Sequence, residues 1–159
     1  TIAKERGLQG FVSVQGHYNL IFREEEREMK RYCDEQGIAM TPYSALASGR
    51  LAKHPGETSQ RLEKDTFALG KYDASSDLDL KIIQRVEELA SKHHVSMSEV
   101  SLSWLMSKVA SPVVGATKLK HVDTAVLATE FELSEEEKQY LEDPYQPHPL
   151  VGVMATNTK

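Results

Sequence analysis

The stretch of sequence that decides the fold is residues 38–51, which read Ile-Ala-Met-Thr-Pro-Tyr-Ser-Ala-Leu-Ala-Ser-Gly-Arg-Leu. Its first four residues form a short, mostly apolar run of the kind that makes a buried strand. Pro42 ends this run because proline lacks the backbone N–H that a strand interior needs. Small and hydroxyl-bearing residues follow at once, and such residues let backbone donors come close to a ligand. We therefore expect a strand over 38–41, followed by a long loop that is either functional or disordered.

Two further stretches have the same arrangement. A strand predicted over 11–15 runs into residues 15–20, Gln-Gly-His-Tyr-Asn-Leu, and a strand predicted over 112–115 runs into residues 114–118, Val-Gly-Ala-Thr-Lys. The last of these strands is short and fully apolar, as buried parallel strands are.

Helices are expected between and after these strands. Residues 24–36 place Met29, Tyr32, Cys33 and Gln36 on one face, and Gly37 ends the helix. Ser-x-x-Glu capping boxes at Ser96 and Ser134 open two more helices. The further predicted ranges are 77–92, 96–108, 120–128 and 134–142. Trp104 lies off the apolar stripe of its helix, which predicts contact with a neighbouring element or a partner.

This order of elements allows two architectures. Alternating strands and helices favour parallel strands joined by right-handed crossovers. The chain has 159 residues, whereas a (β/α)8 barrel needs roughly 250. The chain is therefore either a small open α/β domain or a piece of a barrel. We expect a long loop over 44–76 and an irregular tail over 143–159, which holds three prolines.

Composition limits the possible partners. The net charge of −5 disfavours nucleic acid, which usually meets a basic face. No apolar run approaches the roughly 20 residues that span a bilayer. Cys33 is the only cysteine, so no internal disulfide can form and a cytoplasmic location is expected. The adjacent His93 and His94 point apart at a helix end, so no metal site is predicted. The absence of an initiating Met agrees with a truncated or processed start.

Taken together, the three strand ends resemble the sixth, seventh and eighth strand ends of aldo-keto reductases, in this order and spacing. The resemblance covers essentially the whole chain and is closer to the bacterial and fungal aryl-alcohol-dehydrogenase-like members. It implies an α/β fold that is the C-terminal part of a (β/α)8 TIM barrel, strands 6–8 with their helices. Residues 1–159 would then be one partial barrel domain in which 44–76 covers the cofactor.

The resemblance also implies roles for residues at the first two strand ends. Gln15 matches a glutamine that hydrogen-bonds the nicotinamide carboxamide, and Tyr43 matches an aromatic residue that stacks on the nicotinamide ring. A neutral amide and a flat ring suit these two tasks chemically. The loop that wraps the pyrophosphate is matched by Ser44, Leu46, Ser48 and Gly49.

The third strand end matches the turn that holds the adenosine 2′-phosphate of NADPH. Gly115, Thr117 and Lys118 lie in this turn, where a helix N-terminus and a lysine charge both favour an anion. His121 occupies the slot where the family usually has Arg or Gln. Ala125 stands where many members have an Asn that contacts the adenine, so this contact is not expected here.

The family's catalytic Asp, Tyr, Lys and His lie on the first four strand ends, and nothing in this chain matches them. We assign no catalytic residue, and the chain alone is expected to be inactive. The implied parent activity is NADPH-dependent reduction of a small aldehyde or ketone. The partner would be the missing N-terminal half-barrel or a second copy. Two alternatives stay open, a non-catalytic nucleotide-binding or interaction module with this fold, and an unrelated small α/β domain.

Overall fold

The computed structural model describes residues 2–55, 72 and 76–149, so most of the predicted loop 44–76 and the last ten residues lie outside the described part. The N-terminal half contains α1 Ile2–Glu5, β1 Ser13–Val14, η1 Glu24–Arg27, α2 Met29–Gln36, β2 Ala39–Met40 and η2 Ala47–Ala52. The C-terminal half contains the helices α5 Ser76–His93, α6 Met97–Met106, α7 Leu119–Glu130 and α8 Glu135–Glu142. Residues 143–149 form neither helix nor strand, as predicted for the tail.

Two short parallel strands organise the N-terminal half. Ser13 pairs with Ala39 and Val14 with Met40, and the pairing continues as an isolated bridge between His17 and Tyr43. Both strands lie where the sequence predicts them but are shorter. Parallel pairing over a crossover helix is the arrangement expected of a βαβ unit.

The strand predicted over 112–115 is not formed, which corrects that prediction. The segment still runs beside β2, because the Ser111 N–H donates to the Met40 carbonyl at 3.4 Å and the Val113 N–H to the Pro42 carbonyl at 2.8 Å. A proline at 112 removes the donor between these two bonds. The segment therefore has the path of a third strand without a regular ladder.

The helix predicted over 24–36 is two helices, a second correction. Glu28 has φ −141° and ψ −58°, outside the helical region, and separates η1 from α2. In the tighter η1 turn, residues three apart lie one above the other, and the Arg27 guanidinium contacts the Glu24 carboxylate at 2.5 Å. On the predicted apolar face of α2 only Cys33 is buried, although Gly37 ends the helix in the left-handed region as expected.

The main core lies among α5, α6, α8 and the segment after β1. Helix α6 is buried on almost every side, from Val100 to Leu105. Trp104 is fully buried and contacts neighbouring elements, with its ring 5.7 Å from that of Tyr18. Both predicted capping boxes are present, with Ser96 and Ser134 at the N-caps of α6 and α8.

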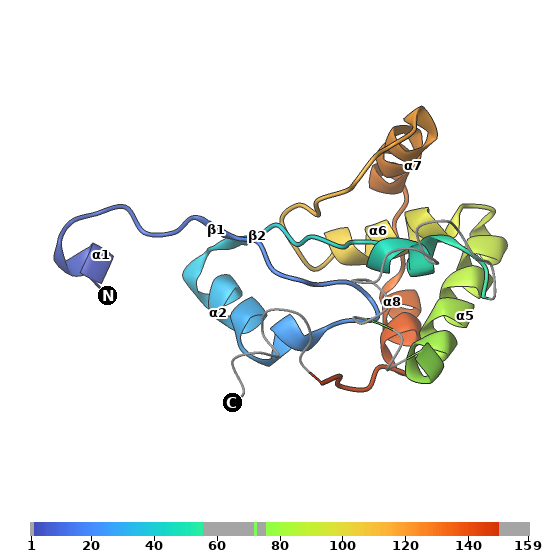
Figure 1. Ribbon diagram of the computed structural model, residues 1–159, viewed down its shortest axis with the longest axis horizontal. Coiled ribbons are helices and arrows are strands. Elements are labelled where there is room, and N and C mark those ends of the chain that lie inside the picture. Colours follow the sequence, from blue (N-terminus) through green and yellow to red (C-terminus); the bar gives the residue numbers. More distant parts are fainter. Residues whose placement is uncertain (1, 56–71, 73–75, 150–159) are drawn as a thin grey trace.

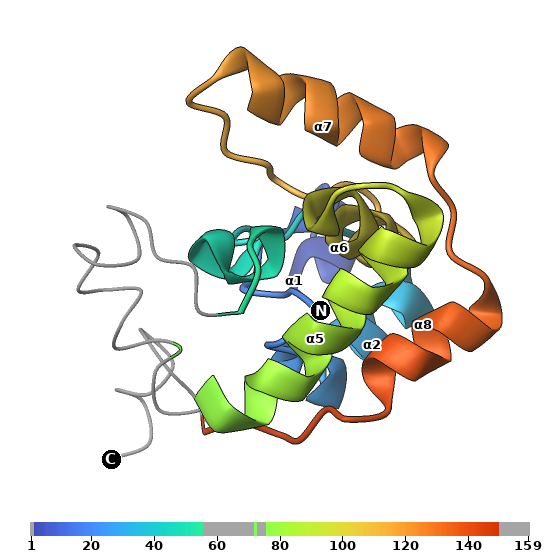
Figure 2. The ribbon, with the colours of Figure 1, turned by 90° about the vertical axis from the view of Figure 1, so that its right-hand side faces the viewer.

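Two helices lie at the margins of the described structure (Figures 1 and 2). Figure 1 shows α1 set apart from the body at the end of an extended segment, and Phe11 in that segment is 89% exposed. Figure 2 shows α7 lying over α6 at the edge of the helix group. In the described part of the chain, no helix has the length and apolar character to cross a membrane.

The capping residue Glu137 should make stability depend on pH. Burial raises the pKa of its carboxyl, but hydrogen bonds from Lys92 and His93 outweigh burial and bring the pKa to about 2, below the ordinary 4.5. Because the folded-state pKa is lowered, the stabilisation is complete above 4.5 and fades as the pH falls towards 2. We expect Glu137→Gln to lower the free energy of unfolding by about 1–2 kcal/mol at neutral pH.

Urea unfolding across pH 2–7 measures this difference, with the exposed Glu132→Gln as the control. The gap between Glu137→Gln and the unchanged chain should close towards pH 2, while Glu132→Gln should follow the unchanged chain throughout. A gap that stays constant over the whole range would contradict the prediction.

Candidate functional site

The first two predicted strand ends lie side by side. The Tyr43 N–H donates to the Gly16 carbonyl at 3.0 Å, and the bridge between His17 and Tyr43 carries the pairing one step beyond the strands. Gln15 follows β1 directly and is exposed. Since the carboxyl ends of parallel strands share one edge, Gln15 and Tyr43 lie at the edge where α/β proteins bind ligands.

Tyr43 presents a large part of its ring to the outside. The residue is 40% exposed, and its ring lies 5.5 Å from the His17 ring with 23° between the two planes. Partial burial raises the pKa of Tyr43, and the negative charge of Glu25 raises it further. The phenol therefore stays neutral at physiological pH, which suits a stacking surface.

The loop after Tyr43 has an unusual backbone. Ser44, Ala47 and Ser48 have φ values of 60°, 47° and 57°, in the left-handed region that residues with a Cβ rarely adopt. Gly49 follows with φ 102°, which only glycine tolerates well. Backbone strain of this kind often accompanies a binding loop.

Some donors of this loop are already engaged. The Ala47 N–H donates to the Ser44 carbonyl at 2.9 Å and the Gly49 N–H to the Leu46 carbonyl at 2.8 Å. Leu46 is half-buried, and Ala47 is buried in the core. These two N–H groups already donate within the loop. A diphosphate bound here, as the resemblance implies, would therefore have to share them with the Ser44 and Leu46 carbonyls.

Three buried polar residues hold this region together, and the sequence analysis did not single them out. The Tyr72 hydroxyl lies 2.7 Å from His17 Nε2, and the Asn19 amide donates to the Tyr72 oxygen at 3.1 Å. The same amide donates to the Ser44 carbonyl at 2.9 Å, which ties the segment after β1 to the loop after β2. Burial raises the pKa of Tyr72 to about 12, so its hydroxyl keeps its proton.

The third predicted group lies at the start of α7. Lys118 precedes the helix with φ −140° and ψ 150°, and its side chain makes no capping hydrogen bond. The Thr117 N–H donates to Nδ1 of His121 at 3.3 Å. Both Lys118 and His121 are exposed, whereas Ala125 is half-buried against the core. A Cβ at Gly115 would meet nothing within 4 Å, so this position does not require glycine for space.

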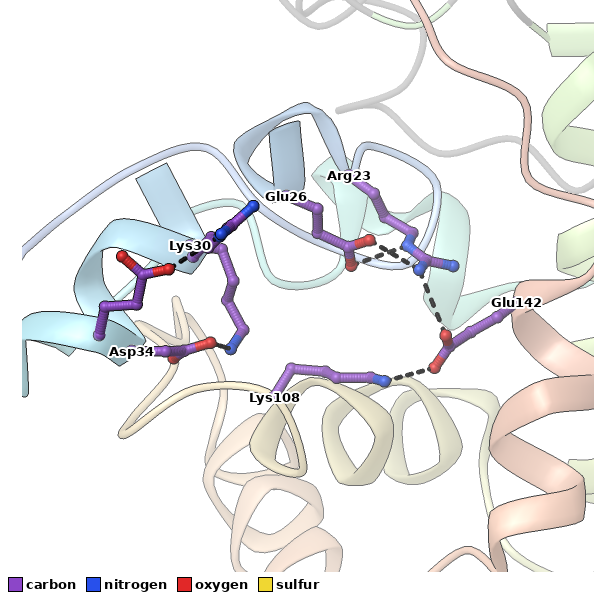
Figure 3. Close-up of a pocket in the computed structure, with 8 residues that line it drawn as sticks. Arg23, Glu26, Lys30, Asp34, Lys108 and Glu142 are labelled. Atoms are coloured by element: carbon purple, nitrogen blue, oxygen red, sulfur yellow. Dashed lines mark hydrogen bonds and ion pairs between the residues drawn. The ribbon is translucent and has the colours of Figure 1, made fainter. Parts of the chain in front are cut away.

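Two hollows of the described surface lie away from the predicted site residues. One hollow of about 440 Å³ is lined by charged residues at η1, in α2, just after α6 and at the end of α8, and several of them pair with one another (Figure 3). Glu142 accepts from Lys108 at 2.7 Å and from Arg23 at 3.2 Å. Because each charge in this pair of bridges already has a counter-charge, the hollow has no net attraction for an ion. None of the predicted site residues lines it.

Comparison with known proteins places this geometry in a family. A model of the aldo/keto reductase family matches residues 2–145. An aldo-keto reductase of Fusarium vanettenii is 43% identical over 152 residues, which are 95% of this chain and 41% of that protein. The versiconal hemiacetal acetate reductase of Aspergillus parasiticus is 41% identical over 150 residues, 92% of this chain and 43% of that protein. A candidate aryl-alcohol dehydrogenase of Schizosaccharomyces pombe is 37% identical over 150 residues, which are 94% of this chain and 43% of that protein.

Solved structures agree on the fold. The glycerol dehydrogenase of Gluconobacter oxydans matches with a TM-score of 0.70 at 21% identity, over 92% of this chain and 46% of that one. A thermostable aldo-keto reductase crystallised with the inhibitor epalrestat matches with a TM-score of 0.64 at 24% identity, over 86% of this chain and 40% of that one. The chain thus spans about two fifths of the length of the curated relatives it matches. From Ile2 to Tyr145, the chain belongs to the aldo/keto reductase family.

Proposed function

We propose that this chain supplies the cofactor side of an NADPH-dependent oxidoreductase that reduces a small aldehyde or ketone and, in reverse, oxidises the alcohol. The observation that carries the proposal is Tyr43, whose partly exposed ring is held at the shared strand edge beside Gln15. The aldo-keto reductases at 41–43% identity support the reductase class. A cytoplasmic location goes with this proposal.

The residues present fit the parts of the cofactor by their chemistry. Tyr43 would cover one face of the nicotinamide, and Gln15 would bind the carboxamide, which needs both a donor and an acceptor. The left-handed turn with Ser44, Ser48 and Gly49 would meet the diphosphate. When bound, NADPH supplies the hydride. This chain's own residues would bind and orient the cofactor and leave one face of its ring accessible.

The group around Lys118 would meet the 2′-phosphate. Thr117 and Lys118 stand before α7, a helix of 12 residues whose N-terminal end carries a partial positive charge. Gly115 would let the turn approach closely, and His121 would add a ring nitrogen one turn into the helix. These positions favour NADPH over NADH, because only NADPH carries the additional phosphate.

Replacing Lys118 tests the cofactor. A charge-assisted contact with a phosphate is worth about 1.5–3 kcal/mol, so we expect Lys118→Ala to weaken NADPH binding by roughly tenfold or more and to leave NADH binding nearly unchanged. Isothermal titration calorimetry with both cofactors measures this. Lys120→Ala removes the same charge from the neighbouring exposed position and should change neither affinity.

Two outcomes would speak against this assignment. Equal losses for both cofactors would show that Lys118 does not read the 2′-phosphate. If titration of NADPH into the unchanged chain gives no heat, and a competition experiment also detects no NADPH binding, the proposed cofactor role of this chain is wrong.

A second candidate function is a non-catalytic nucleotide-binding or interaction module. It is favoured by the exposed apolar residues of the described surface. Phe11 and Val12 are 89% and 66% exposed, Val113 is 45% exposed, and Leu119 is 84% exposed. Cofactor binding without turnover, in a complex with its partner, would favour this module over the enzyme.

The exposed edges predict assembly. Burying one aliphatic side chain contributes about 1.5–3 kcal/mol, and unpaired strand edges recruit further strands. We expect the chain to associate with a second copy or with a polypeptide carrying the N-terminal half of the barrel. Light scattering, together with the fluorescence of a dye that binds apolar surface, measures this. A monodisperse monomer that binds the dye strongly would contradict it.

A further inference from the structure

Three flat rings are stacked at the shared strand edge. The rings of Phe22 and His17 lie 4.1 Å apart with 15° between their planes, and those of His17 and Tyr43 lie 5.5 Å apart with 23° between them. Phe22 is 4% exposed and His17 is 6% exposed, whereas Tyr43 is 40% exposed. The stack therefore begins in the core and ends at the surface, and His17 is its middle ring.

The inner end of the stack is anchored by other buried groups. The His148 ring lies 6.1 Å from the Phe22 ring with 27° between their planes. Nε2 of His148 lies 3.2 Å from the carboxylate of Asp79, and both side chains are almost completely buried. His148 thus packs against Phe22, the inner ring of the stack, and is itself held by Asp79.

The edge of the His17 ring is held as well as its faces. The Tyr72 ring meets it edge-on at a centroid distance of 5.7 Å and an angle of 78°, and the Tyr72 hydroxyl lies 2.7 Å from His17 Nε2. On the main chain, the N–H of His17 donates to the Glu25 carboxylate. With its backbone, edge and faces all in contact, the imidazole has little freedom to rotate.

The contact between His17 and Tyr72 belongs to a hydrogen-bond network. The Asn19 amide nitrogen donates to the Ser44 carbonyl at 2.9 Å and to the Tyr72 oxygen at 3.1 Å, and it lies 3.4 Å from Nε2 of His17. Burial raises the pKa of Tyr72 to about 12, so its hydroxyl keeps its proton. The network thus holds the edge of the His17 ring.

We propose that His17 is a positioning residue, which fixes the plane of the Tyr43 ring before a ligand arrives. The inference rests on the proposed function, in which Tyr43 receives the nicotinamide. A ring that is already fixed loses less conformational freedom on binding, so a flat heteroaromatic ligand is bound more tightly. Offset stacking contributes about 0.5–1.5 kcal/mol for each ring pair. The flat ring of His17 carries the effect, and the hydrogen bond to Tyr72 only holds that ring.

Two substitutions separate this role from ordinary packing. His17→Phe keeps a flat ring between Phe22 and Tyr43 but loses the bond to Tyr72, whereas His17→Leu removes the flat ring and keeps an apolar side chain. The first measurement needs no ligand. The ring-proton chemical shifts of Tyr43, assigned with the Tyr43→Phe variant, report the neighbouring ring directly. We expect His17→Phe to retain shifts displaced by stacking and His17→Leu to move them to the values of unstacked tyrosine.

The second measurement divides the cofactor into its two ends. Reduced nicotinamide mononucleotide and 2′,5′-ADP are titrated separately into the unchanged chain and both variants. We expect His17→Leu to weaken the mononucleotide by about 2- to 12-fold, which corresponds to one stacking contact, and to leave 2′,5′-ADP unchanged. His17→Phe should bind both ligands as the unchanged chain does.

Three results would overturn the proposal. They are unchanged Tyr43 shifts in His17→Leu, equal weakening of both ligands in a variant that keeps the circular dichroism spectrum of the unchanged chain, and loss of the displaced shifts in His17→Phe. If the mononucleotide does not bind even the unchanged chain, the nicotinamide site of the proposed function fails. The ligand-free shifts of Tyr43 still decide whether His17 positions the ring.

Discussion

Trp104→Ala should lower the free energy of unfolding by about 3–5 kcal/mol, the range measured for large aromatic residues truncated in a core. Trp104 is completely buried, with its ring 5.7 Å from that of Tyr18 and the Arg23 guanidinium 5.6 Å from its centroid. Its Nε1–H donates to the Glu142 carboxylate at 2.9 Å. The substitution therefore leaves a cavity and also removes a donor from a carboxylate that lies largely out of water.

Urea unfolding at fixed protein concentration measures this loss of stability. One further variant isolates the contribution of the hydrogen bond, and a second serves as a surface control. Trp104→Phe keeps most of the ring but loses the hydrogen bond, so about 1–2 kcal/mol is expected. Val126→Ala changes a half-exposed position on α7 and should stay within about 0.5 kcal/mol of the unchanged chain. A loss for Trp104→Ala no larger than that for Val126→Ala would show that Trp104 is not part of the core.

The local signals of the sequence predicted the helices well. A capping box depends on residues three apart, so Ser96 and Ser134 could be identified without knowledge of the fold, and Gly37 marked a helix end for the same reason. The break at Glu28 was missed because the helical period runs through it; the turn before it carries a long-range contact, in which the Glu24 carboxylate accepts from the Tyr145 hydroxyl at 2.8 Å, more than a hundred residues away. Tertiary contacts of this range leave no trace in a helical period.

The burial of Trp104 shows the same limit. The predicted apolar stripe of α6 assumed one buried face, but this helix is covered on several sides by η2, α5 and α7, so a residue off the stripe is buried too. Conversely, the stripe predicted for α2 placed Met29 and Tyr32 inside, whereas they are 39% and 49% exposed. Amphipathic spacing gives the direction of a face, and only the neighbouring elements decide whether it is covered.

At the site, the sequence predicted the strand ends but not what holds them. Gln15 and Tyr43 follow strands directly, which is a local feature. The contact of His17 with Tyr72 joins positions 55 residues apart. Tyr72 falls in the range 44–76 that the sequence predicts to be a loop, where polar residues carry no spacing signal. The residues at the strand ends are thus easier to predict than the residues that contact them from elsewhere in the chain.

The chain alone should show no carbonyl reductase activity. Reduction of a carbonyl needs a proton donor for the developing alkoxide, and such donors contribute about 10²–10⁴ in rate when their pKa is near the working pH. A tyrosine can serve only if a nearby cation lowers its pKa. Here burial acts in the opposite direction, raising the pKa of Tyr72 to about 12 and those of Tyr18 and Tyr145 beyond their usual range.

The contacts of these tyrosines agree with that chemistry. Tyr18 donates to the Glu26 carboxylate at 2.5 Å and Tyr145 to that of Glu24 at 2.8 Å, so both hydroxyl protons are held by anions rather than offered to a substrate. We expect NADPH consumption with a panel of aldehydes to equal the buffer control, even where calorimetry detects cofactor binding. Consumption that rises in proportion to the chain concentration would contradict this, and would mean that one of its own residues donates the proton. If activity instead appears only when the N-terminal half of a related barrel is added, that half supplies the proton donor.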